Sequence, residues 1–135
     1  MPIKGRFVMN GTNIAFDTSA VIKLLDQQYD LSSLGINADE AQLLTSVVVR
    51  MELLSKRNMT DNEEQDIREF LDDLIIVPLD EVIEKTAIEL RRSTSLKLPD
   101  SIVAATSIVS DSILLTDDHH LLNLSWPGLR TQNVF

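Results

Sequence analysis

Acidic residues follow short apolar runs or begin helical patterns at several points of this sequence. Asp17 follows the run NIAF, and Asp117 and Asp118 follow the run SILLT. Glu52 lies within VVVRMELL, and Asp100 stands directly after a proline at the head of DSIVAA. Carboxylate oxygens are the ligands that hard divalent cations prefer. If the fold brings these acids together, they would crowd like charges and favour a bound cation such as Mg²⁺ or Mn²⁺.

Each of these acids also has a simpler structural explanation. Asp17 precedes Thr18 and is a suitable N-cap, and Asp118 is placed to cap a short helix after it. Asp100 stands in the first turn of a helix, where proline and an acid are both favoured. Glu52 on a helix is typical of a solvated face. The functional interpretation therefore depends on these acids meeting at one edge, where we expect the helices to supply no neutralising lysine.

Strand-like and helix-like patterns alternate along the chain. Short apolar or β-branched runs predict strands at 13–16, 43–46, 75–79, 112–116 and 131–135, and Pro78 indicates an edge strand. Amphipathic patterns predict helices after Asp17, from about Ser46 or Val47 to Arg57, over 61–74, over 80–92, after Pro99 and after Asp118. This alternation favours an α/β fold with a parallel sheet covered by helices on both faces.

Helical spacing also predicts which side chains face the core. The stripe after Ser46 comprises Val48, Met51 and Leu54. In the helix over 80–92 the inward residues are Val82, Ile83, Ala87 and Leu90. These assignments are predictions of helix phase, which depend on period alone.

The chain is expected to form one domain over residues 9–135. Residues 1–8 are treated as an N-terminal extension without an assigned structure, because the Asn-Gly pair after them signals a hairpin that would compete with the strand at 13–16. In an open parallel sheet, ligands bind beyond the carboxyl ends of the strands, where strand order reverses. Asp17, Asp118, Asp100 and Glu52 would then surround one small volume.

Composition limits the classes of function. The 135 residues carry 12 Lys and Arg against 21 Asp and Glu, a net charge of −9 that argues against a general nucleic-acid-binding surface. It leaves room for an acidic site that meets phosphate through a metal ion. The absence of cysteine removes disulfides and thiolate metal sites. No apolar run is long enough for a membrane span or a signal peptide, so we expect a cytoplasmic protein with no membrane partner.

The chemistry that best fits such a site is metal-assisted hydrolysis of a phosphodiester. Ser19 and Ser101 have no histidine at a recognisable catalytic spacing, and the four glycines form no phosphate-binding loop. His119 and His120 follow the acids, although adjacent histidines on a surface helix are usually simply exposed.

Four segments together carry a family resemblance. IAFDTSAVIKLL, SVVVRMELL, LPDSIVAAT and LLTDDHHLL, in this order and spacing, resemble the PIN-domain family, and the VapC-type toxins of prokaryotic toxin–antitoxin pairs are the most similar branch. The resemblance implies a three-layer α/β/α fold with a mostly parallel sheet of four to five strands. It also implies a Mg²⁺- or Mn²⁺-dependent ribonuclease.

The resemblance assigns roles to individual acids. Asp17, Glu52, Asp100 and Asp118 take the catalytic positions, and Asp17, Asp100 and Asp118 are the implied metal ligands. The last motif, threonine, any residue, then aspartate, selects Thr116 and Asp118, with Asp117 as an alternative fourth acid. Leu121 stands where the family often has phenylalanine, so the resemblance implies a packing residue there. The implied partners are an RNA substrate, a second copy of the chain in a homodimer, and a cognate antitoxin whose C-terminal segment covers the acidic groove.

RNA contacts from this acidic chain would require local cations. The hypothesis names Arg50, Lys56, Arg57 and the segment containing Arg91, Arg92 and Lys97, all of which are otherwise explained as solvated helix ends and loops.

Other functions remain open from the sequence. A response-regulator receiver domain is disfavoured, because only Asp17 follows the first strand, Pro78 precedes the candidate acceptor Asp80, and no lysine follows SILLT. A non-catalytic domain that binds RNA or a partner would not need crowded carboxylates. RNA processing outside a toxin–antitoxin pair and DNA cleavage are alternatives within the nuclease class.

Overall fold

The structure is a computed structural model, and it describes residues 12–26, 31–37 and 39–134. A five-stranded sheet forms its centre, with the strand order β3-β2-β1-β4-β5 and every neighbouring pair parallel. The strands are β1 (Thr12–Phe16), β2 (Ala41–Ser46), β3 (Ile75–Val77), β4 (Ser112–Thr116) and β5 (Arg130–Asn133). The predicted parallel α/β sheet is confirmed, and β3, which precedes Pro78, is an edge strand as predicted.

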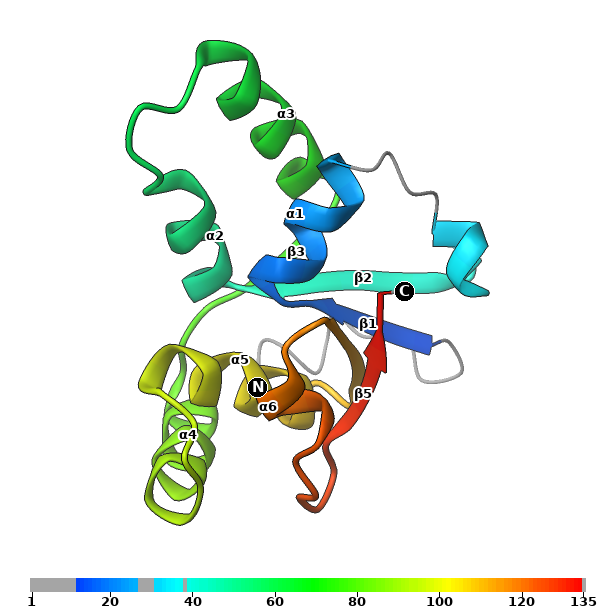
Figure 1. Ribbon diagram of the computed structural model, residues 1–135. Coiled ribbons are helices and arrows are strands. Elements are labelled where there is room, and N and C mark those ends of the chain that lie inside the picture. The colour runs from blue at the N-terminus through cyan, green and yellow to red at the C-terminus, as the bar shows by residue number, and fades with distance from the viewer. Residues whose placement is uncertain (1–11, 27–30, 38, 135) are drawn as a thin grey trace.

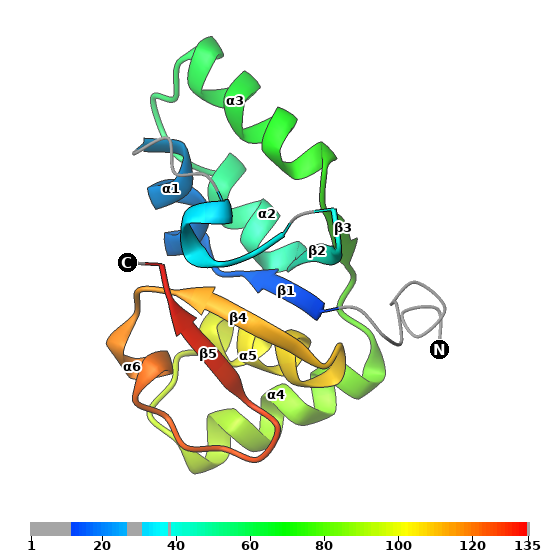
Figure 2. The same cartoon turned by 90° about the vertical axis from the view of Figure 1, so that its right-hand side faces the viewer.

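Helices cover both faces of this sheet. They are α1 (Thr18–Asp26), the 3₁₀ helix η2 (Leu31–Leu34), α2 (Val47–Leu54), α3 (Asp61–Asp72), α4 (Glu81–Ser93), α5 (Leu98–Val109) and α6 (His119–Leu122). Figures 1 and 2 show α1, α2 and α3 on one side of the strands and α4, α5 and α6 on the other. The three-layer α/β/α class is therefore confirmed, and the change from strand to helix after Ser46 falls where the sequence predicted it.

The strand register brings the ends of three strands to one level. Phe16 in β1 lies opposite Thr45 in β2 and Leu115 in β4. Successive residues of parallel strands stay aligned. The residues that follow, among them Asp17 and Thr116, therefore emerge side by side at the carboxyl edge. Strand order reverses beside β1, which makes this edge the expected ligand-binding position of the fold.

The predicted inward face of one helix is wrong, and one residue of a second helix is exposed against prediction. In α2, Met51 is 62% exposed, while Val49 and Leu53 are buried and form the inward face. In α4, Val82 is 43% exposed, whereas Ile83, Ala87 and Leu90 are buried as predicted. Both helices contain more apolar residues than one face holds, so spacing alone does not select the buried stripe.

Helix α5 is the most deeply buried helix of the layer formed by α4, α5 and α6. Ala104, Ala105, Ser101 and Ser107 are fully buried within it. Their small side chains allow the helix axis to approach its neighbours closely, and α5 lies between α4 and the sheet (Figure 2). This packing fixes the first turn of α5, which carries Asp100, against the sheet.

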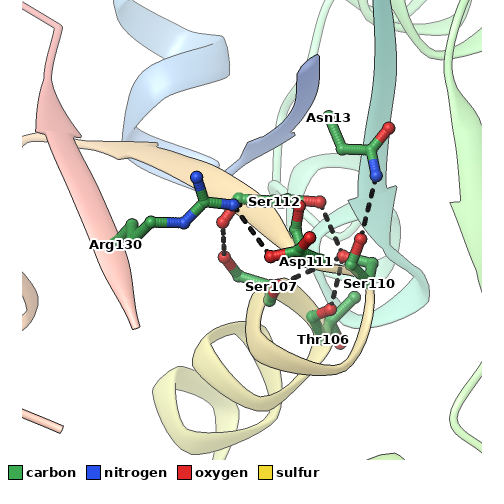
Figure 3. A network of polar contacts seen from close by, with 7 residues as sticks. All are labelled: Asn13, Thr106, Ser107, Ser110, Asp111, Ser112 and Arg130. Atoms are coloured by element: carbon green, nitrogen blue, oxygen red, sulfur yellow. Dashed lines mark hydrogen bonds and ion pairs between the residues drawn. The ribbon is translucent and has the colours of Figure 1, made fainter. Parts of the chain in front are cut away.

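A network of polar side chains closes the opposite end of β1 and β4, with neutral side chains in its buried part and the Arg130–Asp111 ion pair on its exposed side (Figure 3). The Asn13 amide donates to the carbonyl of Ser110 at 3.0 Å, and the hydroxyls of Ser110 and Ser112 lie 2.6 Å apart. Ser107 donates to the Ser112 carbonyl at 3.1 Å. These groups are buried, and the bonds satisfy backbone groups where α5 passes into β4.

The N-terminal extension assigned to residues 1–8 lies outside the described residues. Within the described ranges, no helix is both long and apolar enough to span a membrane.

Candidate active site

Asp17 lies at the centre of the carboxyl edge. Its amide continues the ladder by donating to the Leu115 carbonyl at 3.0 Å, which places it between β1 and β4. Thr116 donates its hydroxyl to Asp17 Oδ2 at 2.7 Å, and the Thr18 amide donates to Oδ1 at 2.7 Å. The residue is only 6% exposed. Both oxygens of the Asp17 carboxylate are therefore engaged. The bond from Thr18 comes from the first amide of α1, whereas a capping side chain accepts from the second or third.

Burial and neighbouring acids raise the pKa of Asp17. Desolvation is the largest cause, and the charges of Asp118 and Glu52 raise the pKa further, while hydrogen bonds from Thr116 and Thr18 oppose the shift. The fold therefore holds this carboxylate where its charge is costly in the absence of a cation.

Asp100 occupies the first turn of α5, one residue after Pro99, as predicted. Desolvation is again the largest cause of a raised pKa, followed by the charges of Asp17, Asp118 and Glu52. Lys97 lowers the pKa of Asp100, but its effect is the smallest of those that act. Asp17 and Asp100, which are far apart in sequence, therefore interact at one edge rather than lying on opposite sides of the molecule.

Asp118 is joined to Asp17 through Thr116. Its amide donates to Thr116 Oγ1 at 3.0 Å, and the same hydroxyl donates to Asp17. Asp118 also caps α6, because its Oδ1 accepts from the His120 amide at 2.9 Å. Thus the capping role and the position at the acidic edge coexist in one side chain. Leu121 beneath it is fully buried, as predicted, and His119 and His120 are exposed.

Asp117 behaves differently from its neighbour. Its carboxylate forms an ion pair with Lys23 of α1 at 3.0 Å, and its amide donates to Ser19 Oγ at 3.2 Å. Partial burial acts to raise its pKa, but the Lys23 ammonium and the Ser19 hydroxyl outweigh it, so the pKa of Asp117 is lowered. Burial is the largest cause of the raised pKa of both Asp17 and Asp100, and the charge of Asp118 raises both further. The geometry thus favours Asp118 over Asp117 as the fourth acid.

Glu52 lies on α2, on the face of the sheet opposite to the helix α5 that carries Asp100. Ser46 caps α2 by accepting from the Val48 amide, which fixes the start of the helix that carries Glu52. The Thr18 hydroxyl donates to Glu52 Oε1 at 3.0 Å. Glu52 is exposed, yet it raises the pKa of both Asp17 and Asp100. All four acids chosen from the sequence therefore interact electrostatically around one edge.

Sequence reasoning missed two contacts here. The expectation that the helices supply no lysine is wrong, because Lys23 on α1 pairs with Asp117. The hydrogen bond from Thr18 to Glu52 was also missed. Both contacts join segments that are distant in sequence, and no local pattern identifies such partners.

The donor set is compatible with Mg²⁺ or Mn²⁺. Within the described ranges, no three or more His, Asp or Glu side chains lie close enough together to hold one ion jointly. Mg²⁺ does not require such a group, because it usually takes one or two carboxylates and keeps several waters. Burial, followed by the charges of neighbouring acids, raises the pKa of Asp17 and of Asp100, and a cation at this edge would offset both effects.

Comparison with known families agrees with this geometry. The model of the PIN domain matches residues 14–127, which includes all four acids. The chain belongs to the PIN-domain family. No curated protein matches the sequence significantly.

Solved structures of the same fold align with most of this chain and with nearly all of their own. VapBC2 from Rickettsia felis bound to a promoter DNA fragment aligns with a TM-score of 0.77 and 19% identity, covering 90% of this chain and 98% of that one. A toxin–antitoxin complex from Klebsiella pneumoniae aligns at 0.72 with 23% identity, covering 90% and 98%. DNA-bound VapBC from Salmonella typhimurium aligns at 0.77 with 14% identity, covering 92% and 99%. At these identities the likeness establishes the fold.

Proposed function

We propose that this PIN domain is a metal-dependent endoribonuclease and the toxin component of a VapBC-type toxin–antitoxin pair. The observation that carries the nuclease proposal is the mutual interaction of Asp17, Glu52, Asp100 and Asp118 at the carboxyl edge. Four carboxylates in one place are costly for stability, and a site for a divalent cation explains them. The toxin proposal is supported by the VapBC complexes among the solved structures of the same fold.

In this proposal Asp17, Asp100 and Asp118 hold Mg²⁺ or Mn²⁺, directly or through water. When bound, the cation polarises the phosphoryl group and makes a water molecule more acidic. Thr116 and the Thr18 amide orient Asp17 by hydrogen bonds of 2.7 Å each. The proposal assigns Glu52, which is exposed and accepts a hydrogen bond from the Thr18 hydroxyl, the role of accepting a proton from the attacking water.

Cleavage of a labelled single-stranded RNA tests the nuclease proposal. Cleavage should require Mg²⁺ or Mn²⁺, stop in EDTA, and fall in Asp100→Asn by about 100-fold or more, because the cation supplies several kcal/mol to the transition state. A single-stranded DNA of the same sequence serves as the alternative substrate.

Asp111→Asn is the matched control for that experiment. Asp111 is an exposed aspartate at the start of β4, and its φ of 53° is one that asparagine tolerates. It should retain cleavage close to that of the unaltered chain. Cleavage that ignores both EDTA and Asp100→Asn would contradict the mechanism.

A groove beside the acidic edge supports an antitoxin partner. It has a volume of about 320 Å³ and lies between α1, α2 and α3. Its apolar lining residues are Ile22, Leu25, Leu53 and Ile67. Its charged lining residues are Asp26, Glu52, Asp66 and the Lys56–Glu63 ion pair, so the lining is acidic overall. Thr18 and Glu52 line it as well, so the groove continues into the acidic edge. An amphipathic helix with basic residues complements such a lining.

The first step is to inspect the reading frame immediately upstream of this gene, and a small DNA-binding protein encoded there is the partner to test. Ile22→Glu should weaken its binding at least tenfold, because it places a charge among the apolar groove residues. Ile88→Glu on α4 is a control of similar exposure, 42% against 46% for Ile22, outside the groove. Equal loss of affinity in both variants would contradict the groove assignment.

The proposal also includes a homodimer. Sedimentation equilibrium of the purified chain should then give twice the 15.1 kDa mass of one chain. A monomer at micromolar concentration would contradict this part of the proposal and leave the nuclease assignment unaffected.

A further inference from the structure

One segment of this acidic chain concentrates positive charge. Residues 91–97 contain Arg91, Arg92 and Lys97 and no acidic residue, in a chain with a net charge of −9. All three side chains are exposed. Basic residues in the last turn of α4 are also favoured by the helix dipole, which would explain Arg91 and Arg92 but not Lys97, which lies beyond that helix.

The three cations lie at the end of the α4–α5 hairpin that carries Asp100. Arg91 and Arg92 are in the last turn of α4, and Lys97 is the N-cap residue of α5. The carbonyl of Lys97 accepts from the Ser101 amide at 2.9 Å, which places Lys97 within the same helical turn as Asp100. The effect of Lys97 on the pKa of Asp100 agrees with this proximity.

These cations differ from most other basic side chains in the described ranges. Lys23, Lys56, Arg68 and Arg130 are each engaged in an ion pair with a carboxylate. No ion pair within the described part of the chain engages Arg91, Arg92 or Lys97. Their charges are therefore available to a ligand, and the Lys56–Glu63 pair removes Lys56 from the cations considered as RNA contacts.

We propose that Arg91, Arg92 and Lys97 form a basic strip that binds the backbone phosphates of RNA beside the acidic edge. This inference rests on the proposed ribonuclease function. An RNA strand that approaches the acidic edge meets repulsion from four carboxylates. Cations along one border of that edge hold the strand by its phosphates without reading its bases. The strip thus positions the scissile linkage, whereas Asp17, Asp100 and Asp118 do the chemistry.

The test compares two triple variants with the same change in net charge. The strip variant is Arg91→Ala with Arg92→Ala and Lys97→Ala. The control variant is Arg68→Ala with Lys85→Ala and Arg130→Ala, three exposed cations that are not among the RNA contacts considered from the sequence. The ion pairs of Arg68 and Arg130 are exposed, so losing them costs little stability. Arg68 is on α3, Lys85 is on α4 before the strip, and Arg130 begins β5. Circular dichroism confirms that both variants fold.

Binding of a fluorescent single-stranded RNA is measured in EDTA from 50 to 300 mM salt, which separates binding from cleavage. Each phosphate contact contributes about 0.7 to the slope of log K against log salt for single strands, so loss of the strip should reduce the slope by about 2. Loss of these phosphate contacts corresponds to an affinity about 10- to 100-fold lower at 0.1 M salt. The control variant should change affinity less than about threefold. Arg91→Lys with Arg92→Lys should retain binding, because phosphate contact depends on charge.

The outcomes separate this inference from the proposed function. A strip variant that keeps the slope of the unaltered chain overturns the strip, even if the protein cleaves RNA. Equal losses in the strip and control variants also overturn it, because they show an effect of net charge alone. An unaltered chain without salt-dependent RNA binding overturns it as well. If the chain binds RNA through the strip but does not cleave with Mg²⁺, the strip is supported and the ribonuclease assignment fails.

Discussion

The two ends of strands β1 and β4 carry opposite kinds of polar group. At the start of the strands, Asn13, Ser110 and Ser112 are neutral, buried and hydrogen-bonded to one another or to backbone carbonyls (Figure 3). At the carboxyl end, Asp17 and Asp118 are acids whose charges interact unfavourably. The same pair of strands therefore has an end that stabilises the fold and an end whose charges work against it.

This difference separates stability from function along 5-residue strands. Buried neutral groups that find partners stabilise the connection from α5 to β4. Buried like charges are retained at a cost, which is typical of sites for a cation or for catalysis. The contrast predicts that substitutions at the two ends act on different measurable quantities.

The largest expected effect distinguishes adjacent acids at the carboxyl end. Asp118→Asn should lower RNA cleavage by about 100-fold, because it removes a carboxylate from the cation site. Asp117→Asn should change cleavage less than about threefold, because that carboxylate is paired with Lys23 and partly exposed. Rates of cleavage under single-turnover conditions measure both. If Asp117→Asn lowers the cleavage rate more than Asp118→Asn does, Asp117 and not Asp118 is the fourth acid of the site.

Thr116→Val should have the next largest effect. It removes the 2.7 Å hydrogen bond to Asp17 and the acceptor for the Asp118 amide while keeping the shape of the side chain. Groups that orient metal ligands are typically worth 10- to 100-fold in activity or affinity, and we expect about tenfold. Loss of the hydrogen bond also raises the pKa of Asp17 further, so the pH–rate profile should shift to higher pH. An unchanged profile with a lower melting temperature would make Thr116 purely structural.

At the other end, Asn13→Ala should reduce stability without reducing cleavage per folded molecule. Asn13 is 7% exposed and donates to the Ser110 carbonyl, which would be left unpaired. A lost buried hydrogen bond of this kind costs about 1 kcal/mol of unfolding free energy. Urea unfolding and the cleavage rate are measured together. A cleavage loss larger than the change in the folded fraction would couple the two ends and break the contrast.

The smallest expected effect has the opposite sign. In EDTA at pH 7, Asp100→Asn should raise the melting temperature by about 1 to 3 °C, because it removes a carboxylate that repels its neighbours. The pKa of Asp100 is higher in the folded than in the unfolded chain, so the folded state binds more protons between these values. Stability then falls as pH rises through this window, and the advantage of the variant should disappear below the ordinary pKa range of aspartate. Scanning calorimetry from pH 3 to 7 checks this. A higher melting temperature of the variant at pH 3 but not at pH 7 would contradict the predicted pH dependence.

Local patterns in the sequence were sufficient to predict the sheet and the acidic edge. The runs ending at Phe16 and Thr116, and the proline before Asp100, are short-range signals for strand ends and a helix start. Once those elements are placed in a parallel sheet, the meeting of Asp17 and Asp100 follows from topology.

The details that escaped prediction depend on partners distant in sequence. The inward face of α2 is set by what Val49 and Leu53 pack against, and the exposure of Met51 cannot be read from spacing. The Lys23–Asp117 pair and the Asn13–Ser110 bond join residues from different parts of the chain. Charge and polarity identify such residues as candidates but do not identify their partners.

Direct titration of Mn²⁺ into the metal-free chain, followed by the loss of free Mn²⁺ signal in electron paramagnetic resonance, tests the central claim. The carboxyl edge should bind Mn²⁺ in the unaltered chain and in Asp111→Asn, and binding should be lost in Asp17→Asn with Asp100→Asn. Equal Mn²⁺ binding by all three proteins would contradict the assignment of this edge as the metal site.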